Sequence, residues 1–525
     1  MLWVVGLMAA VSEAGQSYDI SRLQLPSPPL RSPLPLLVLG SAGPVPNEPK
    51  GAGGLLVAGC SGGEGGGDDG GGQNETVPWT CCLGCSSPGP ALVTAAGVEI
   101  RGRSSQAAAK KSFSIELRSF DGSDSPHSLL GLPAGADWVL AGLGLDRSLL
   151  RDGLAALLAR AQGRWAPRSV FVELFVVEDG AGELDPERHY RGVYALTESI
   201  ERAPNRVDVQ ALRDKDPRGG WILELNNAAA SEWWAGQLGE QLPSAIVKLG
   251  PSRVDWKYPE PSRAPPAAWR LASSALTELS TALSDWGAYS SGDGASPGSA
   301  PRARLSSLLD LPSAADWLLH TELACDYDGF VSSVYLHRDR TGPLVAGPVW
   351  DKNLAYGNEA EVTSPTGCGW RYAAPAVQNS GQPALWFAAL AHAGWWRAAV
   401  AERWRMLRSE LWSDAALGNA VDSLADRLPR EAVRRNFNRW PLQSITTNNR
   451  FVTLPPSRGS WQEEVSALRS WLLARARWLD GQLLGPGGAS LAAPQPPNLV
   501  TGVLGAVMGG RTVLRAFQEG SGIGG

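Results

Sequence analysis

Alternating polar and apolar residues predict strands in the first half of the chain. The run SFSIEL alternates polar residues with Phe113, Ile115 and Leu117, which is the period-two pattern of a half-buried strand. Lys111 has the same parity as these apolar residues, so the pattern favours an inward position for Lys111 over Lys110. Apolar runs predict further strands at 33–39, 169–177, 190–197 and 219–225.

Apolar residues spaced three and four positions apart predict helices, most of them in the second half. Residues 145–163 have this spacing, with Asp146 as the N-cap, and so do residues 313–323. Residues 386–484 are mostly helical by the same pattern and are dense in Trp, Arg and Leu. Strands first and helices later are typical of an α+β fold with two lobes, and ligands usually bind in the cleft between lobes.

Stretches rich in Gly and Pro indicate how the chain is divided. We expect one domain over 33–486, with a Gly- and Cys-rich insert at 51–90 that lies outside its core. A strand-rich N-lobe is expected at about 91–230 and a helix-rich C-lobe at about 231–486. The Gly- and Pro-rich tail at 487–525 is expected to be disordered.

The N-terminal region favours a secretory route. Residues 1–15 form an apolar stretch followed by small residues, as in a weak or truncated signal peptide, although no basic residue precedes the apolar part. An ordinary apolar N-terminus is the alternative. Asn74-Glu75-Thr76 matches the N-glycosylation pattern. We therefore expect a secreted, cell-surface or coat protein, with a cytoplasmic location as the alternative.

The cysteines support the same route. Four of the six cluster in the Gly-rich insert, where disulfides are the favoured interpretation and a chance cluster is the alternative. A zinc site is disfavoured because no histidine lies nearby. Cys325 and Cys368 are expected to be buried or partnered. The clustered cysteines are Cys60, Cys81, Cys82 and Cys85.

Charge and hydropathy exclude two kinds of partner. The chain has 47 Lys and Arg against 52 Asp and Glu, and this net charge of −5 is spread along the sequence. We therefore expect no nucleic-acid partner, since such binding needs a basic surface. No window reaches the ~18 apolar residues of a spanning helix, so no transmembrane segment is expected.

Three carboxylates are the strongest candidates for chemistry. Asp326 and Asp328 follow a predicted helix, and Asp351 follows an apolar strand. Between them, Val331–Leu336 and Pro343–Val345 predict a hairpin. Because a hairpin returns the chain to its starting point, these carboxylates can converge on one cation.

Two amides extend this candidate metal site. Asn353 and Asn358 add oxygen ligands near Asp351, and oxygen-only ligation favours Mg²⁺ or Mn²⁺ completed by phosphate oxygens. The alternative is structural: Asp328 is then an ordinary residue after a helix, and Asp351 is a buried acid bonded to the backbone.

Lysine is scarce, so its positions are informative. Only seven lysines occur, and two of them, Lys110 and Lys111, lead into a predicted strand where an ammonium could bind phosphate. A solvated strand start is the alternative. Glu198 and Glu224 could hold the inward lysine or be structural. Three arginines could bind phosphate but are better explained as partners of acids: Arg101, Arg103 and Arg151.

Several familiar motifs are absent. The chain has no GxxxxGK[ST] phosphate loop and no DFG string, and the HRD at 337–339 lies in the predicted hairpin turn without an Asn at the required offset. The five histidines are scattered, which argues against a His-based metal site and a Ser-His-Asp triad.

Six ordered segments closely resemble the CotH kinase family, the spore-coat H-like atypical protein kinases. The resemblance runs from about Leu34 to about Leu484 and is interrupted by the Gly-rich insert. The segments are IRGRSSQAAAKKSFSIEL, LLGLPAGADWVLAGLGLDRSLLRDGLA, RGVYALTESIER, GGWILELN, TELACDYDGFVSSVYLHRDRTGPLVAGPVWDKNLAYGN and WLLARARWLD.

The resemblance implies a highly diverged two-lobed protein-kinase-like fold. It implies transfer of the γ-phosphate of ATP to Ser or Thr of secreted or coat proteins, with Mg²⁺ or Mn²⁺ as the metal. Asp328 then corresponds to the catalytic-loop aspartate and Asp351 to the metal-binding acid. The candidate metal ligands are Asp351, Asn353 and Asp326. The candidate nucleotide-binding residues are Lys111, Lys110, Glu198 and Arg101.

Two departures from the family pattern affect the expected activity. The family usually has Asn where this chain has Asp326, and the added negative charge either helps to hold the metal or misplaces Asp328. The run 107–109 is all Ala, where family members carry larger residues. The alternative function is a non-catalytic, adhesin-like surface or coat-binding protein. A metal-dependent hydrolase is a third reading, disfavoured because clustered Asp and multiple His are lacking.

Overall fold

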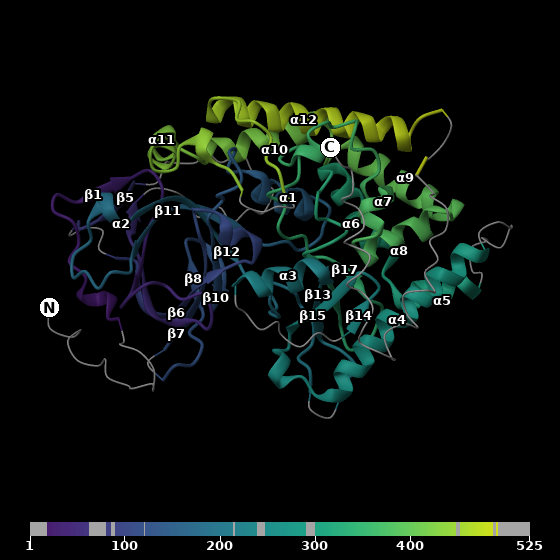
Figure 1. Cartoon of the computed structure of the whole chain (residues 1–525), viewed down its shortest axis with the longest axis horizontal. Coiled ribbons are helices and arrows are strands. Elements are labelled where there is room, and N and C mark those ends of the chain that lie inside the picture. Colours follow the sequence, from purple (N-terminus) through teal and green to yellow (C-terminus); the bar gives the residue numbers. More distant parts are fainter. Residues whose placement is uncertain are drawn as a thin grey trace, which may run out of the picture.

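The computed structural model describes most of the chain as a barrel of strands beside a larger part rich in helices (Figure 1). The described residues are 18–61, 80–85, 90–119, 121–213, 216–238, 247–289, 300–447, 452–486 and 490–491. The expected signal peptide, the glycosylation pattern at Asn74 and nearly all of the expected disordered tail lie outside them. The described part is an α+β structure, as the sequence patterns predict.

Seven strands form a closed barrel. They are β2 (Leu36–Ser41), β3 (Gly51–Val57), β6 (Leu92–Arg101), β7 (Ser112–Arg118), β10 (Asp137–Ala141), β11 (Ser169–Val177) and β12 (Tyr190–Glu198). Their order is β10-β12-β11-β2-β3-β6-β7, and β7 pairs back with β10. Strands β11 and β2 are parallel, whereas the other neighbours are antiparallel. Phe113, Ile115 and Leu117 belong to the barrel core, so the alternation predicted for β7 is confirmed.

The expected insert at 51–90 begins later than its Gly content indicates. Residues 51–57 form β3, a barrel strand that pairs with β2 and β6. A Cβ on Gly53 would lie 2.5 Å from the carbonyl oxygen of Gly40, and one on Gly54 would lie 2.6 Å from Ile20 Cγ2. These glycines allow close packing of the barrel wall, so here Gly marks a crowded strand and not a loop.

A small sheet lies against the outside of the barrel and contains part of the expected insert. It is formed by β1 (Leu30–Ser32), β5 (Thr80–Leu83) and β4 (Gly59–Ser61) in that order. Cys81 and Leu83 of β5 share a hydrophobic cluster with Leu36 and Val38 of β2. A further hairpin joins β8 (His127–Leu129) to β9 (Leu132–Gly135).

A second sheet lies among the helices. Its five antiparallel strands follow the order β14-β15-β13-β16-β17. They are β14 (Val247–Leu249), β15 (Ser252–Tyr258), β13 (Trp221–Asn227), β16 (Val334–Arg338) and β17 (Val345–Ala346). The hairpin predicted before Asp351 is confirmed as β16 and β17. The strand predicted at 219–225 was assigned to the N-lobe, but as β13 it pairs with β15 and β16 and not with the barrel, because its partners come from the second half.

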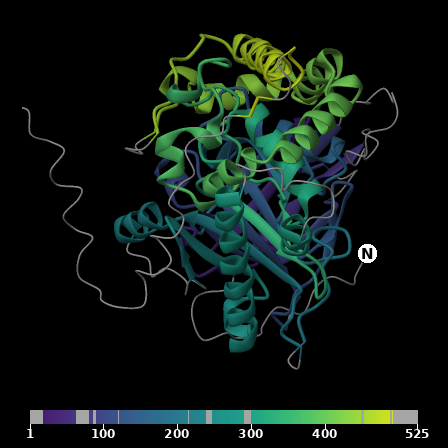
Figure 2. The same cartoon turned by 90° about the vertical axis from the view of Figure 1, so that its right-hand side faces the viewer.

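Helices cover the second sheet and one end of the barrel (Figures 1 and 2). The expected helix at 313–323 is confirmed as α6. The helices are α1 (Arg151–Ala161), α2 (Pro186–His189), α3 (Ala228–Leu238), α4 (Pro266–Tyr289), α5 (Ala300–Leu308), α6 (Leu311–Ala324), α7 (Pro375–Gln378), α8 (Gln382–Ala391), α9 (Gly394–Ser409), α10 (Asp414–Asp426), α11 (Arg430–Arg439) and α12 (Trp461–Leu483).

The first long helix begins later than predicted. The sequence pattern places its start beside Asp146, whereas α1 begins at Arg151. The Asp146 carboxylate nevertheless accepts the backbone N–H of Arg151, at 2.8 Å, and that of Ser148, at 2.9 Å. Asp146 therefore satisfies an N–H of the first turn from outside the helix.

The helices and the second sheet share one large hydrophobic core. Trp221, Trp396, Trp404 and Trp412 are fully buried in it, which accounts for the density of Trp in the second half. Within the described segments, no helix is both long enough and apolar enough to cross a bilayer.

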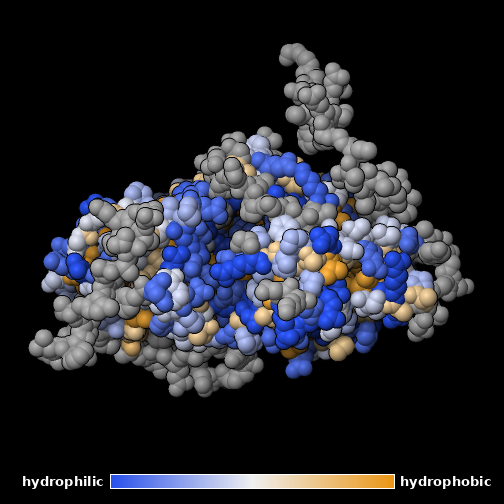
Figure 3. Space-filling model, turned by 90° about the horizontal axis from the view of Figure 1, so that it is seen from below, coloured by the Kyte–Doolittle hydropathy of each residue, from blue (hydrophilic) through white to orange (hydrophobic). Residues whose placement is uncertain are grey.

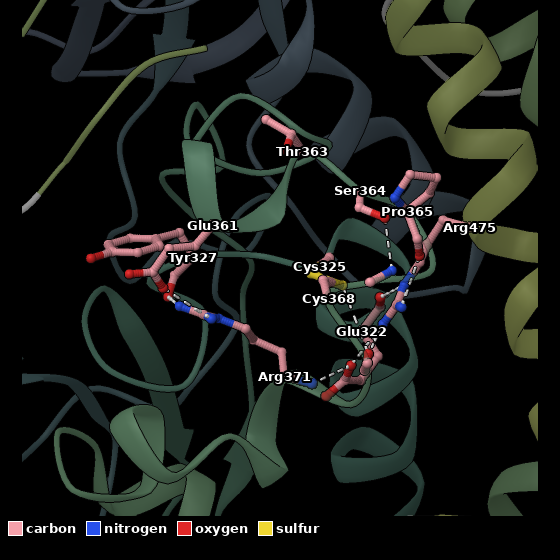
Figure 4. The surroundings of a disulfide bond; sticks show 12 residues. Glu322, Cys325, Tyr327, Glu361, Thr363, Ser364, Pro365, Cys368, Arg371 and Arg475 are labelled. Atoms are coloured by element: carbon pink, nitrogen blue, oxygen red, sulfur yellow. Dashed lines mark hydrogen bonds and ion pairs between the residues drawn. A yellow bond between two sulfur atoms is a disulfide. The ribbon is translucent and has the colours of Figure 1, made fainter.

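Three disulfides link the six cysteines, as favoured by the sequence. They are Cys60–Cys81, Cys82–Cys85 and Cys325–Cys368. Figure 4 shows the third beside Glu322 and Arg475, at the end of α6. It joins the residue before Asp326 to the loop that precedes Arg371, so it closes the largest of the three covalent loops.

Replacing Cys325 and Cys368 together with Ser is expected to lower the free energy of unfolding by roughly 4 kcal/mol. The bond spans 43 residues, and in the chain-entropy account a longer loop stabilises more. Urea denaturation of the oxidised proteins measures the loss. The matched control is the Cys82→Ser, Cys85→Ser pair, which spans 3 residues and should cost roughly 2 kcal/mol. An equal or larger loss in the control would contradict this expectation.

His320 of α6 should make folding sensitive to acid. Its side chain is buried, its Nε2 lies 2.9 Å from the carbonyl oxygen of Ala155, and burial lowers its pKa to about 4. The unfolded chain has an ordinary histidine pKa of about 6.5 and binds the proton first as pH falls. The contribution of His320 to the free energy of unfolding is therefore fully present above about pH 6.5. It is lost as the pH falls toward 4, by up to roughly 3 kcal/mol.

Urea unfolding of the wild type and His320→Gln at pH 7 and pH 4.5 tests this expectation. A glutamine amide can still donate to the Ala155 carbonyl but does not titrate. The variant should lose less free energy of unfolding between the two pH values than the wild type. Equal losses would show that His320 does not cause the acid sensitivity.

Candidate functional site

The turn after α6 carries two of the candidate carboxylates. Cys325 ends the helix with a left-handed φ of 38°, and Asp326 follows fully buried. The Asp328 N–H donates to Asp326 Oδ1 at 3.2 Å, and the Asp328 carbonyl accepts the N–H groups of Val331 and Ser332. A Cβ on Gly329 would lie 2.7 Å from Asp326 Oδ2, so only glycine leaves room for this carboxylate.

The third candidate, Asp351, lies in a strained segment after β17. Its φ is 58°, a left-handed conformation that Asp tolerates better than most residues and that is often found at functional sites. Asn353 Nδ2 donates to Asp351 Oδ1 at 2.7 Å, and the Ser333 hydroxyl lies 3.4 Å from Oδ2. The amide of Asn353 therefore orients the Asp351 carboxylate.

The two ends of the hairpin meet, as the sequence predicts. Lys352 Nζ lies 2.6 Å from Asp326 Oδ2, which joins the residue after Asp351 to the turn after α6. The charges of Asp326 and Asp351 act on Asp328, which is half-buried. Burial first, and then these two acids, raise the pKa of Asp328 to about 7.

Asp351 is also shifted. Its side chain is exposed at the mouth of a cavity, but the surrounding protein displaces much of the water, and this burial raises its pKa. The neighbouring cations Lys352 and Arg101 oppose the shift, whereas Asp326 and Glu224 add to it. Asp351 therefore lies among charges of both signs, and two of them, Arg101 and Glu224, are far from it in the sequence.

The position of Asp326 does not suit a metal ligand. Its carboxylate is fully buried, with Oδ1 bonded to the Asp328 N–H and Oδ2 paired with Lys352. The negative charge of Asp326 is thus neutralised by a neighbouring lysine. Asn358 is also structural, because its buried amide donates to the carbonyls of Leu145 and Asn353. Asp351 and Asn353 are the candidates that stay available to a cation.

A cavity of about 150 Å³ opens beside Asp351. It is bounded by the ends of β6, β7, β10, β11 and β12, by α1 and by residues 349–353. Apolar side chains such as Val139 and Phe171 line it together with Lys110, Arg101 and Asp351. In the view from below, hydrophilic residues gather in the middle of the molecular face (Figure 3).

Lys110, and not Lys111, lines this cavity, so the parity prediction is wrong. Strand β7 begins at Ser112, and the alternation does not extend to the residues before it. Lys110 is 6% exposed, and its Nζ donates to the Val193 carbonyl and, at 2.8 Å, to Asn436 Oδ1. Lys111 is half-buried, and its Nζ donates to the Gln106 carbonyl.

Neither expected glutamate holds these lysines. Glu198 is fully buried and binds Arg168 through both carboxylate oxygens, at 2.9 and 2.7 Å. Glu224 pairs with Lys257 at 2.7 Å. Lys110 has no carboxylate partner among the described residues, and burial lowers its pKa well below the usual lysine value. Within the described segments, no carboxylate therefore compensates a positive charge on Lys110, and burial disfavours its protonated form.

The candidate arginines divide into two groups. Arg101 lines the cavity with its guanidinium 5.0 Å from the centre of the Trp350 ring, and within the described segments it forms no ion pair. Arg151 is buried and pairs with Asp146, and Arg103 donates to the Ser231 hydroxyl at 3.3 Å. Of these three arginines, only Arg101 is still a candidate for binding phosphate.

Asp152 is a site residue that the sequence did not identify. It lies in the first turn of α1, lines the cavity, and accepts the backbone N–H of Lys352 at 2.7 Å. Burial and the nearby Asp351 raise its pKa to about 7. The only sequence signal was an acid in the segment RDGLA, where a first-turn Asp is an ordinary helix feature.

The arrangement has the donor types of a phosphate and cation site, although it lacks a dense metal cluster. Within the described segments, no group of three or more His, Cys, Asp or Glu side chains converges on one point. Asp351 and the amide oxygen of Asn353 can bind a cation whose other ligands come from a bound molecule or water. Lys110 and Arg101 are basic side chains in the lining of the same cavity.

Comparison with family models matches residues 98–479 to the CotH kinase protein family. The match contains Lys110, Asp328 and Asp351 and leaves out strands β2 and β3. A search of curated proteins finds no match. Since the family match covers about three quarters of the chain, the chain belongs to the CotH kinase protein family.

Proposed function

We propose that this chain is an atypical protein kinase that transfers the γ-phosphate of ATP to Ser or Thr residues of protein substrates. The observation that carries the proposal is that Asp351 lines a cavity together with Lys110 and Arg101, while its charge acts on Asp328 in the turn after α6. Phosphoryl transfer needs mainly positioning and electrostatic stabilisation, and these residue types are sufficient for it. Membership of the CotH kinase protein family supports the same reading.

The residues at the cavity fit a nucleotide and its metal ion. Apolar groups such as Val139 and Phe171 suit a base, whereas Lys110 and Arg101 suit phosphates. Asp351 and Asn353 would hold Mg²⁺ or Mn²⁺. When bound, the metal ion supplies positive charge that stabilises the phosphate oxygens during transfer.

In this mechanism Asp328 orients the substrate hydroxyl and accepts its proton. A pKa of about 7 suits a group that exchanges a proton near neutral pH. Asp351 and Asn353 would hold the metal ion that binds the phosphates, and Lys110 and Arg101 counter the negative charge of the phosphates, including the charge on the departing ADP. Tyr194 covers the Lys110 ammonium, at 4.9 Å from the ring centre, and helps to exclude water from it.

The proposed function includes a two-lobed kinase fold and a location outside the cytoplasm. The barrel corresponds to a strand-rich N-lobe and the helical part to a C-lobe of a highly diverged kinase, with the nucleotide between them. The three disulfides favour an oxidising compartment and hence secreted, cell-surface or coat substrates. A non-catalytic, adhesin-like binding protein is the alternative, and it requires no response to nucleotide.

Removing the Asp351 carboxylate should abolish the response to nucleotide. In a thermal melt, saturating ATP with Mn²⁺ should raise the stability of the wild type, by about 2.7 kcal/mol at a hundred times Kd. Asp351→Ala should melt normally without ligand, because among the described residues this exposed side chain forms hydrogen bonds only with Asn353 and Ser333. The variant should show no shift with ATP and Mn²⁺. A folded wild type that does not shift would favour the binding-protein alternative.

Asp328→Asn is the matched variant for the chemical step. It should keep the nucleotide-dependent shift but lower transfer of ³²P from ATP to dephosphorylated casein at least ~100-fold, which is the usual contribution of a general base. Unchanged transfer in this variant would contradict the role of Asp328.

The two adjacent lysines provide a direct comparison. Lys110→Met should raise KM for ATP about ten-fold, because the variant keeps the buried volume but loses the cation at the cavity. Lys111→Met should change KM less than two-fold, since Lys111 lies outside the cavity lining. Steady-state kinetics with varied ATP measures both values. A larger effect at Lys111 would restore the assignment made from sequence parity.

A further inference from the structure

We propose that Lys352 is a positioning residue that fixes Asp328 and Asp351 relative to each other. Its ammonium neutralises Asp326, and its backbone N–H is anchored by Asp152. This inference rests on the proposed kinase function and gives a role to one of the seven lysines of the chain.

The contacts of Lys352 join two segments around the site. The Lys352 side chain is 2% exposed, and its Nζ lies 2.6 Å from Asp326 Oδ2. The other oxygen of that carboxylate, Asp326 Oδ1, accepts the N–H of Asp328. In the other direction, the Lys352 N–H donates to Asp152 Oδ1 on α1 at 2.7 Å. Lys352 therefore connects the turn that carries Asp328 to helix α1, which carries Asp152.

The backbone contact acts directly on Asp351. The peptide unit between Asp351 and Lys352 carries the N–H that Asp152 accepts, so this hydrogen bond limits rotation about ψ of Asp351. Asp351 has a left-handed φ of 58°, and such a conformation persists only where surrounding contacts determine it. The first turn of α1 supplies a rigid anchor for that purpose.

The side-chain contact controls charge near Asp328. A fully buried Asp326 without a partner would place a second negative charge beside Asp328 and would be strongly unfavourable. The Lys352 ammonium removes that charge while leaving Asp326 Oδ1 to hold the Asp328 backbone. The buried Lys352–Asp326 pair thus has no net charge.

A double-mutant cycle tests this assignment. Lys352→Met and Asp326→Asn each leave one buried charge alone, whereas the combined variant leaves neither, and an Asn at 326 can still accept the Asp328 N–H. In the assay of ³²P transfer from ATP with Mn²⁺ to dephosphorylated casein, each single variant should lower kcat at least ~100-fold. The combined variant should recover to within about ten-fold of wild type.

Two measurements separate positioning from loss of fold. Thermal melts identify the folded variants, and all kinetics are run below the lowest melting temperature. Lys50→Met is the matched control: Lys50 pairs with Glu116 and Asp137 on the barrel, none of these three residues lines the cavity, and the variant should leave kcat unchanged. A kcat for Lys352→Met within two-fold of wild type would overturn the proposal, as would a folded combined variant no more active than the weaker single one.

The anchor on α1 provides a second route if a single variant does not fold. Asp152→Ala removes the acceptor for the Lys352 N–H and should lower kcat at least ~30-fold, whereas Asp152→Asn keeps an acceptor oxygen and should retain most of the activity. Equal kcat values for these two variants would overturn the proposal.

The outcome for Asp351→Ala distinguishes this inference from the function on which it rests. Transfer that depends on Asp351 but not on Lys352 would overturn the positioning role alone. A wild type that transfers no phosphate and shows no shift with ATP and Mn²⁺ would overturn the proposed function and this role with it.

Discussion

Pairing of buried charges holds together the loops on which the candidate site depends. Glu322 of α6 is fully buried; it accepts the N–H groups of Arg371 and Tyr372 and pairs with the buried Arg475 of α12 at 3.1 Å. One carboxylate therefore links three segments that are far apart in sequence. Because an uncompensated charge in such a place would be strongly destabilising, each of these loops has essentially one arrangement that satisfies its partners.

The same principle applies on the barrel side. Glu173 of β11 is buried and accepts hydrogen bonds from Tyr190, at 2.6 Å, and from Arg435 of α11, at 2.9 Å. Asn436, next to Arg435, accepts from Lys110 Nζ and from the Val193 N–H. Helix α11 therefore holds the barrel through polar contacts and not only through packing. The position of Lys110 depends on a residue more than 300 positions away in sequence.

Local patterns in the sequence were reliable where a single face decides the structure. The alternation at Phe113, Ile115 and Leu117 predicts β7, and the hairpin before Asp351 predicts that its two ends meet, as the Lys352–Asp326 ion pair shows. Local patterns fail where the partner of a residue is far away in the sequence. Lys111 was misassigned because a strand pattern was extended past the start of β7, and the partner of Glu198 proved to be Arg168, which no spacing rule connects to it.

Composition was misleading for a physical reason. Gly53 and Gly54 look like insert residues in sequence, but they are needed because neighbouring backbone and Ile20 approach too closely for a Cβ. Asp152 was missed for the opposite reason, since an acid in the first turn of a helix is common and only the contact with the Lys352 N–H distinguishes this one. In both cases the decisive information is a three-dimensional distance between segments.

The barrel closes only with strands that lie outside the residues matched by the family model. The match begins at residue 98, inside β6, whereas β2 and β3 lie before it and connect β11 to β6. A polypeptide restricted to the matched region would also lose residues 92–97 of β6, and it would leave the edges of β11, of the shortened β6 and of part of β7 unpaired. Such edges pair readily with other chains, so the glycine-containing strands outside the matched region protect the protein against aggregation.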